Sequence, residues 1–169
     1  MSPAEPPPEF QRLLAIDRIG PGGLDDTVRA DAAECAALAL RLGVPALPSL
    51  ECAFRLTAGP AGFVHAVGRL RARVDRICVV TLDAFETAVD EAFSLDFVPA
   101  GHESEEIDPE SDDEVPYEGG AIDLGEAAAE QLALVLDPYP RKPGVTLPED
   151  DAAQADSPFA ALSRLKRGE

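Results

Sequence analysis

The stretch GFVHAVGRLRARVD, residues 62–75, decides the predicted fold because apolar and polar side chains alternate along it. One set of alternate positions is apolar or small: Val64, Ala66, Gly68, Leu70, Ala72 and Val74. The intervening positions are largely cationic: Phe63, His65, Val67, Arg69, Arg71, Arg73 and Asp75. Successive side chains of a β-strand point to opposite faces, so the pattern predicts a strand with one apolar and one largely cationic face. Because the stretch exceeds the usual strand length, we also expect a bend or bulge near Gly68.

Two neighbouring stretches, residues 49–57 and 86–98, show the same alternation. In the second stretch one face is apolar: Val89, Phe93, Leu95 and Phe97. Its other face is small or acidic: Asp90, Ala92, Ser94 and Asp96. Three such strands in succession predict an antiparallel meander that has one side on a core and the other side in water.

Further strands and helices are predicted around this meander. Residues 10–16 and 24–30 have the character of strands and flank a Gly-Pro-Gly-Gly turn, which predicts a hairpin. Asp31 and Asp123 are each followed three positions later by glutamate and then by an apolar stretch, as at helix starts. We therefore predict an α+β fold with two main helices and a mostly antiparallel sheet, either an open meander or a partly closed barrel.

Charge is distributed unevenly along the 169 residues, whose formal net charge is −18. Residues 9–100 contain 13 acids and nine bases, whereas residues 101–136 contain 12 acids and no base. Such an acidic block repels itself and stays solvated, and its alternative role is to contact a basic partner such as a ribosomal protein. The predicted organisation is a disordered tail (1–8), a single α+β domain (9–143) with a flexible acidic loop (101–120), and a linker with a short amphipathic C-terminal segment (144–169).

The cysteines and the N-terminal sequence indicate the cellular compartment. Cys35, Cys52 and Cys78 show no C-x-x-C spacing, which predicts reduced thiols. The beginning MSPAEPPPEF lacks the basic and apolar regions of a secretory leader, and no apolar run is long enough to cross a bilayer. We therefore expect a cytoplasmic location and no membrane partner.

Residue patterns in the chain do not signal catalysis. Paired carboxylates on rigid elements or a nucleophile–histidine pair are not indicated, and Cys78 is expected to be a small buried residue. His102 lies beside several glutamates, but a loop gives a cation no fixed geometry. We predict a protein that is not an enzyme and that has no metal site, no cofactor and no small-molecule substrate.

A cluster of arginines in and directly after residues 62–75 is the first candidate binding site. Its members are Arg69, Arg71, Arg73 and Arg76, with His65 at one end. Alternate strand residues lie about 6.5–7 Å apart, which suits contact with successive phosphates of RNA. The competing interpretation is a solvated face in which these arginines pair with acids of neighbouring strands: Glu51, Asp90 or Asp96.

The C-terminal segment is the second candidate. Ser157-Pro158 is a good helix start, and the apolar and basic residues after it are partner-binding candidates: Phe159, Leu162, Leu165 and Lys166. A helix this short is unstable alone in water. It must dock either on its own domain or on a partner, and both alternatives stay open.

Three stretches together resemble the YceD family, the large ribosomal RNA subunit accumulation proteins. Cys78-Val-Val-Thr-Leu82-Asp-Ala-Phe85 is similar to the C-x-x-x-L-x-x-F segment of the family. Gly120-Ala-Ile122-Asp123-Leu124, continuing through Leu132 to Pro138 and Pro140, resembles its G-x-I-D-L, helix and proline signature. The ending from Pro158 to Lys166 resembles its P-F-A-x-L-x-x-L-K tail.

The resemblance implies a factor for the synthesis, processing or stability of large-subunit (23S) rRNA, without catalytic activity. Its partners would be that rRNA or the assembling large ribosomal subunit. The alternative is an adaptor or chaperone that holds a basic ribosomal protein through the acidic loop and the C-terminal segment. Some members carry C-x-x-C at the first motif, whereas here Thr81 stands three positions after Cys78, so neither a redox pair nor a zinc site carries over.

Overall fold

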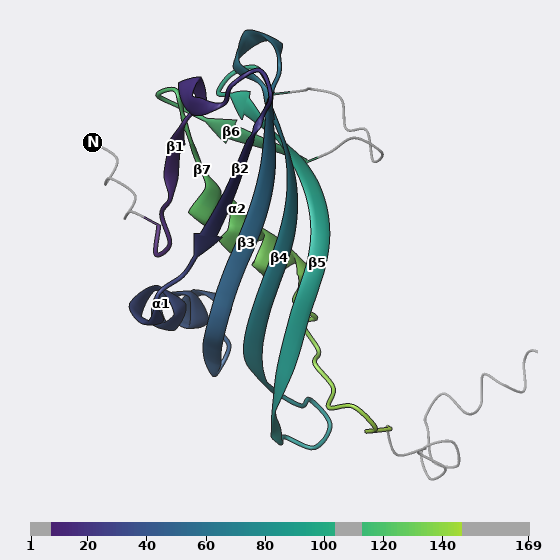
Figure 1. Ribbon diagram of the computed structural model, residues 1–169. Helices are drawn as coiled ribbons and strands as arrows, with labels where there is room; N and C mark the ends of the chain where they lie inside the picture. Colours follow the sequence, from purple (N-terminus) through teal and green to yellow (C-terminus); the bar gives the residue numbers. More distant parts are fainter. Residues whose placement is uncertain (1–7, 104–112, 147–169) are drawn as a thin grey trace, which may run out of the picture.

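The computed structural model describes residues 8–103 and 113–146, and its main feature is an open, curved five-stranded sheet (Figure 1). The strands follow the order β2 (Leu24–Arg29), β3 (Ala46–Ala58), β4 (Val64–Ile77), β5 (Ala84–Pro99) and β6 (Asp113–Tyr117). Neighbours from β2 to β5 are antiparallel, and β6 runs parallel to β5. The predicted α+β class and the meander are confirmed, in the open form of the sheet.

Strand β4 shows the alternation that the sequence predicts. Val64, Leu70 and Val74 are fully buried, whereas the arginines between them are exposed. Of the bend or bulge expected near Gly68, the bulge is absent, because the pairing of β4 with β3 and β5 continues through this residue without a shift. A register shift lies instead in β3, between Ala46 and Ser49.

Gly68 is needed for packing. A Cβ atom on this residue would lie 2.2 Å from Cζ of Phe93, whose ring covers the Gly68 backbone. The same ring packs edge-on against Phe54, with ring centroids 5.8 Å apart. The small residue in β4 therefore makes room for an aromatic pair formed by the two flanking strands.

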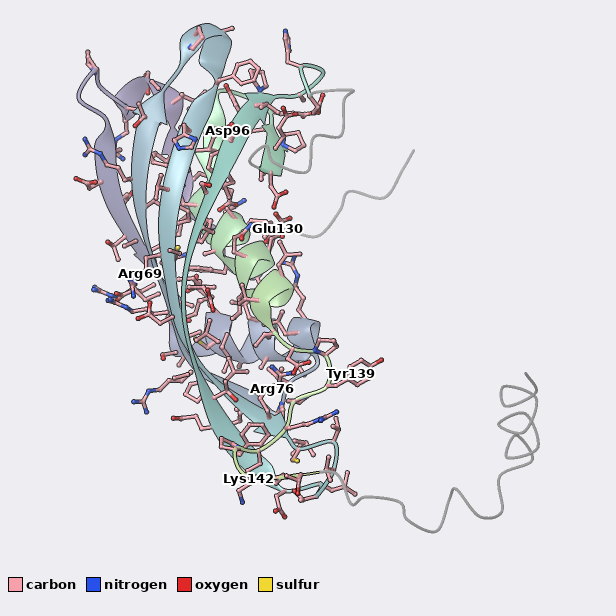
Figure 2. The ribbon with its side chains drawn as sticks, turned by 90° about the vertical axis from the view of Figure 1, so that its right-hand side faces the viewer. Arg69, Arg76, Asp96, Glu130, Tyr139 and Lys142 are labelled. Carbon is pink, nitrogen blue, oxygen red and sulfur yellow. The ribbon has the colours of Figure 1, made fainter. Side chains whose placement is uncertain are left out.

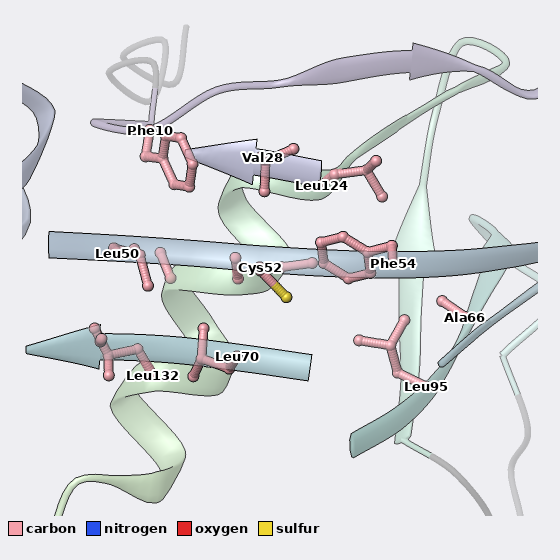
Figure 3. Packing of buried hydrophobic residues seen from close by; sticks show 14 of the residues in the cluster. Phe10, Val28, Leu50, Cys52, Phe54, Ala66, Leu70, Leu95, Leu124 and Leu132 are labelled. Atoms are coloured by element: carbon pink, nitrogen blue, oxygen red, sulfur yellow. The ribbon is translucent and has the colours of Figure 1, made fainter. Parts of the chain in front are cut away.

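Two helices cover parts of the inner face of the sheet. Helix α1 (Ala32–Leu42) begins with a capping box in which Asp31 accepts from the backbone N–H groups of Ala33 and Glu34. Helix α2 (Leu124–Val135) begins at Asp123, which accepts from the N–H groups of Gly125 and Glu126. Figure 3 shows Leu124 and Leu132 of α2 next to side chains of the strands. The core is thus closed by an amphipathic helix laid on the apolar face of an antiparallel sheet.

The predicted N-terminal hairpin was wrong, because β1 (Leu13–Ala15) pairs with β7 (Ala121–Asp123) in a separate two-stranded sheet. One carboxylate joins these distant segments. Asp123 accepts from the Arg12 backbone N–H at 2.8 Å, and the Leu124 N–H donates to the Arg12 carbonyl at 3.0 Å. Gly125 permits this approach, since a Cβ there would lie 2.3 Å from the Phe10 carbonyl oxygen.

The acidic loop predicted over residues 101–120 contains regular structure. Residues 113–117 form β6, which lies beside the last five residues of β5, and β7 follows soon after. Short 3₁₀ helices occupy Ile16–Arg18 and Pro60–Gly62. The N-terminal tail to residue 7, residues 104–112 and the C-terminal segment from residue 147 lie outside the described residues, so the domain boundaries stay predictions.

Replacing Gly68 by alanine should destabilise the protein by about 1–3 kcal/mol, because the new Cβ must push the Phe93 ring out of its contact with Phe54. Urea unfolding followed by circular dichroism measures the loss. Gly20→Ala is the matched control, since nothing lies within 4 Å of a Cβ at that residue. Adding Phe93→Leu should restore part of the loss, and equal stability of Gly68→Ala and the native chain would contradict the packing role.

Candidate functional site

Three arginines of β4 form an exposed line that we call the arginine row: Arg69, Arg71 and Arg73. Their side chains are 56, 59 and 64 % exposed. Figure 2 shows Arg69 projecting from the side of the sheet opposite to α2. The row therefore lies on the outer face of the sheet, at the spacing that alternate strand residues have.

Each member of the row is close to a carboxylate of β5. Arg69 Nε lies 2.6 Å from Asp90 Oδ1, and Arg71 Nε lies 3.5 Å from Asp90 Oδ2. Arg73 is 3.1 Å from Glu86. The hydrogen bond from Arg69 is the main cause that lowers the pKa of Asp90, and the same bond raises the pKa of Arg69. Exposed pairs of this kind contribute little to stability, so phosphate can replace the carboxylates at low cost.

The other predicted partners of the arginines bind different residues. Asp96 lies 2.8 Å from His65 Nδ1, and Glu51 pairs with Arg29 of β2. The competing interpretation, a solvated and charge-paired face, is thus realised in part through Asp90. His65 lies on the same outer face as the arginine row, nearer the other end of β4.

Arg76 does not belong to the row and is a correction to the predicted cluster. It lies on the inner face, is 8 % exposed, and donates a hydrogen bond to the backbone carbonyl of Asp137. The alternation of β4 gives the reason, because Arg76 is an odd number of positions from Arg73 and so faces the opposite way.

Two of the stretches that carry the family resemblance meet in space at the link between β4 and β5. Cys78 donates its N–H to the Asp83 carbonyl, and Leu82 donates to the Cys78 carbonyl, each at 2.9 Å. The N–H of Val79 donates to the Pro140 carbonyl, also at 2.9 Å, which ties the link to the chain after α2. These two stretches therefore stabilise one common turn.

The thiol of Cys78 is fully buried, as the sequence predicts, but it is not an ordinary core thiol. Hydrogen bonds from the backbone N–H of Lys142, and then from the hydroxyl and backbone of Thr81, lower the pKa of Cys78 to about 6. The thiol of Cys52 differs from that of Cys78, because its burial raises its pKa to about 12. Thr81, which departs from the C-x-x-C pattern, thus supplies hydrogen-bond donors that favour the ionised form of the thiol. No local sequence pattern predicts this effect, because its largest contribution comes from Lys142.

The remaining candidates from the family motifs have mainly structural positions. Ile122, Leu124 and Leu132 are at most 1 % exposed in the core, and Asp123 caps α2. Phe85 is half-buried on β5, and Leu82 is 76 % exposed. The partner-binding candidates lie outside the described residues: Phe159, Leu162, Leu165 and Lys166.

No group of three or more histidine, cysteine or acidic side chains within the described part of the chain is arranged to hold a metal ion. Among the helices of the same part, each is too short or too polar to span a membrane.

Comparison with known proteins gives one match. Residues 66–166 match the model of the family described as large ribosomal RNA subunit accumulation protein YceD. The matched region includes most of β4, all of β5 and α2, and therefore the arginine row and the Cys78 turn. The searches of curated proteins and of solved structures returned no match.

The lowered pKa of Cys78 predicts a pH dependence of stability. An unfolded cysteine has a pKa of about 8.5, so the folded state binds fewer protons than the unfolded state from pH about 6 to 8.5. Urea unfolding should therefore show a stabilisation from Cys78 that is complete above pH about 8.5 and is lost as the pH falls through about 6. The difference between the native chain and Cys78→Ala isolates this slope, and a difference independent of pH would contradict the thiolate.

The backbone conformation of Leu82 makes a stabilising substitution possible. Its φ angle of 60° is unfavourable for leucine, and its side chain is mostly exposed to water. Asparagine adopts this conformation more readily, so Leu82→Asn should raise the free energy of unfolding by about 1 kcal/mol. Leu40→Asn, at a residue 85 % exposed on α1, is the control and should lose a few tenths of a kcal/mol. Destabilisation by Leu82→Asn would show that the leucine side chain packs within the protein.

Proposed function

Because this chain belongs to the family of large ribosomal RNA subunit accumulation proteins, we propose that it promotes the synthesis, processing or stability of 23S rRNA by binding, without catalysing a reaction. The observation that carries the proposal is the family match over residues 66–166. A protein that covers the transcript on the assembling large subunit would protect it from degradation and so raise its level. We place this role in the cytoplasm.

We assign the RNA contact to the arginine row, with His65 as an additional contact. The row presents three guanidinium groups to solvent, and these pair with two carboxylates of β5, because Arg69 and Arg71 share Asp90. Phosphate oxygens accept hydrogen bonds from guanidinium groups in the same bidentate manner as carboxylates do. Successive phosphates of an extended RNA strand would displace Asp90 and Glu86 at little cost in stability.

The distribution of charge limits how the RNA approaches. The formal net charge of −18 opposes long-range attraction of a polyanion, although screening confines most of that repulsion to about 8 Å at physiological salt. RNA contact through the row therefore depends on short-range hydrogen bonding. Such a protein prefers RNA that is already held near it, as on an assembling subunit.

A second candidate function is an adaptor that holds a basic protein. It is favoured by β5, which contains four acids and no base: Glu86, Asp90, Glu91 and Asp96. An acidic strand at the border of a sheet suits a cationic polypeptide better than it suits RNA.

Changing Arg69, Arg71 and Arg73 together to glutamate should weaken binding to a single-stranded fragment of large-subunit rRNA. Each lost phosphate contact should also reduce the slope of log affinity against log salt by about 0.7–0.9. Fluorescence anisotropy over a series of salt concentrations measures both effects. The variant should fold normally, because the pairs it breaks lie on the surface.

The matched control is the triple variant Arg18→Glu, Arg29→Glu and Arg55→Glu, which makes the same change in net charge at exposed residues outside the row. Equal weakening in both variants would assign the effect to overall charge and not to the row. In cells, a strain depleted of the protein should lose large-subunit rRNA. Normal rRNA levels and subunit profiles after depletion would refute the proposed function itself.

A further inference from the structure

The outer edge of β5 is open over most of its length. Strand β5 runs from Ala84 to Pro99, but β6 pairs only with the five residues from Leu95 onward. Among the residues that the structure describes, no strand pairs with the outer edge of residues 84–93 (Figure 1). Half of the backbone N–H and C=O groups along such an edge point away from the sheet, which makes it a template for another strand.

Charge is the main feature that protects this edge from strand addition. The sequence AFETAVDEAFS contains no proline, no lysine and no glycine. Its pairing with β4 is continuous, so no bulge twists the edge away. Glu86, Asp90 and the inward-pointing Glu91 disfavour an acidic or apolar strand, but they do not disfavour a basic one.

A groove runs beside the same edge, between the inner face of β5 and the end of α2. It has a volume of about 450 Å³, and its apolar walls include Phe85, Val89, Val135 and Leu136. Phe85 and Val89 are half-buried, and Val135 is 39 % exposed. Figure 2 views this side of the molecule, with β5 on one side and α2 and the chain through Tyr139 on the other. Alternate side chains of an added strand would enter the groove, while its backbone pairs with β5.

The charges on β5 define the occupant. Glu86 and Asp90 point to the outer face, and Glu91 points to the groove side. Two copies of this acidic edge laid side by side would bring like charges together along the whole seam, which disfavours a second copy. Arg76 and Arg141 line the groove, which disfavours cations of a partner on that side, so these cations belong on the outer side near Glu86 and Asp90.

We propose that residues 84–94 of β5 bind an extended, basic polypeptide segment of a partner protein by strand addition. The segment carries lysine or arginine on the side of Glu86 and Asp90, and aliphatic side chains on the groove side. This site lies on the open edge of β5, whereas the arginine row lies on β4, and Glu86 and Asp90 border both contacts. The inference goes beyond the proposed RNA contact and specifies how the adaptor function would operate.

The test uses the full-length chain and a fluorescein-labelled peptide of about ten residues in which lysine and valine alternate, which is long enough to cover the edge. Anisotropy should show saturable binding, and hydrogen–deuterium exchange should show protection of residues 84–94 when the peptide is present. Two further peptides carry N-methyl groups on alternate backbone nitrogens, one peptide on the odd and one on the even positions. One of them should bind about tenfold or more weakly, because it loses several hydrogen bonds to the edge, and the other should bind almost normally.

Matched variants test the charge. Glu91→Lys should weaken binding of the peptide severalfold, whereas Glu118→Lys, the same charge change at an exposed residue away from β5, should leave it unchanged. Equal binding of both methylated peptides, or binding without protection of residues 84–94, would overturn the proposal in favour of non-specific attraction to acids. Protection of these residues without peptide, together with a dimer in sedimentation, would overturn it in favour of a second copy. None of these outcomes alters the test of the arginine row, so failure of either proposal can be recognised separately.

Discussion

The alternation of β4 is the constraint on which the rest of the structure depends. Its inner side chains are small or aliphatic and lie in the core beneath α2, so the strand cannot shift by one residue without burying guanidinium groups. That fixed register determines which residues of β3 and β5 lie opposite each residue of β4. It places Gly68 beneath the ring of Phe93, and it places Asp90 and Glu86 within reach of the arginine row.

The two faces of the sheet thereby acquire different chemistry from one short sequence. On the outer face, arginines of β4 lie beside acids of β5, and both sets of side chains are exposed to solvent. On the inner face, Arg76 is held by the Asp137 carbonyl, and the Cys78 turn is joined to the chain after α2. The family match covers both halves of this arrangement.

Local patterns predicted most of this architecture. The meander, the α1 capping box and the Asp123 cap follow from periodicity and cap spacing. Arg76 was wrongly grouped with the row, because closeness in sequence was weighed above the alternation of the strand. The pairing of β1 with β7 was missed because it joins segments more than a hundred residues apart, for which neither segment carries a local signal. Strand β6 was missed because acidic residues and Pro116 are typical of loops, and only the adjoining β5 orders them. The donors around the Cys78 thiol likewise come together only in the fold.

The hydrogen bond between the Arg12 backbone and the Asp123 carboxylate has a consequence for folding during synthesis. These residues are 111 positions apart, so a chain emerging from the ribosome must expose its first strand until the start of α2 has been synthesised. Contacts of such long range slow folding, because a large loop must close before they form. The nascent chain therefore passes through a stage in which the sheet is assembled but one end of its core is uncovered. The time at which this protein completes its core is therefore set by how fast the ribosome synthesises the chain as far as α2.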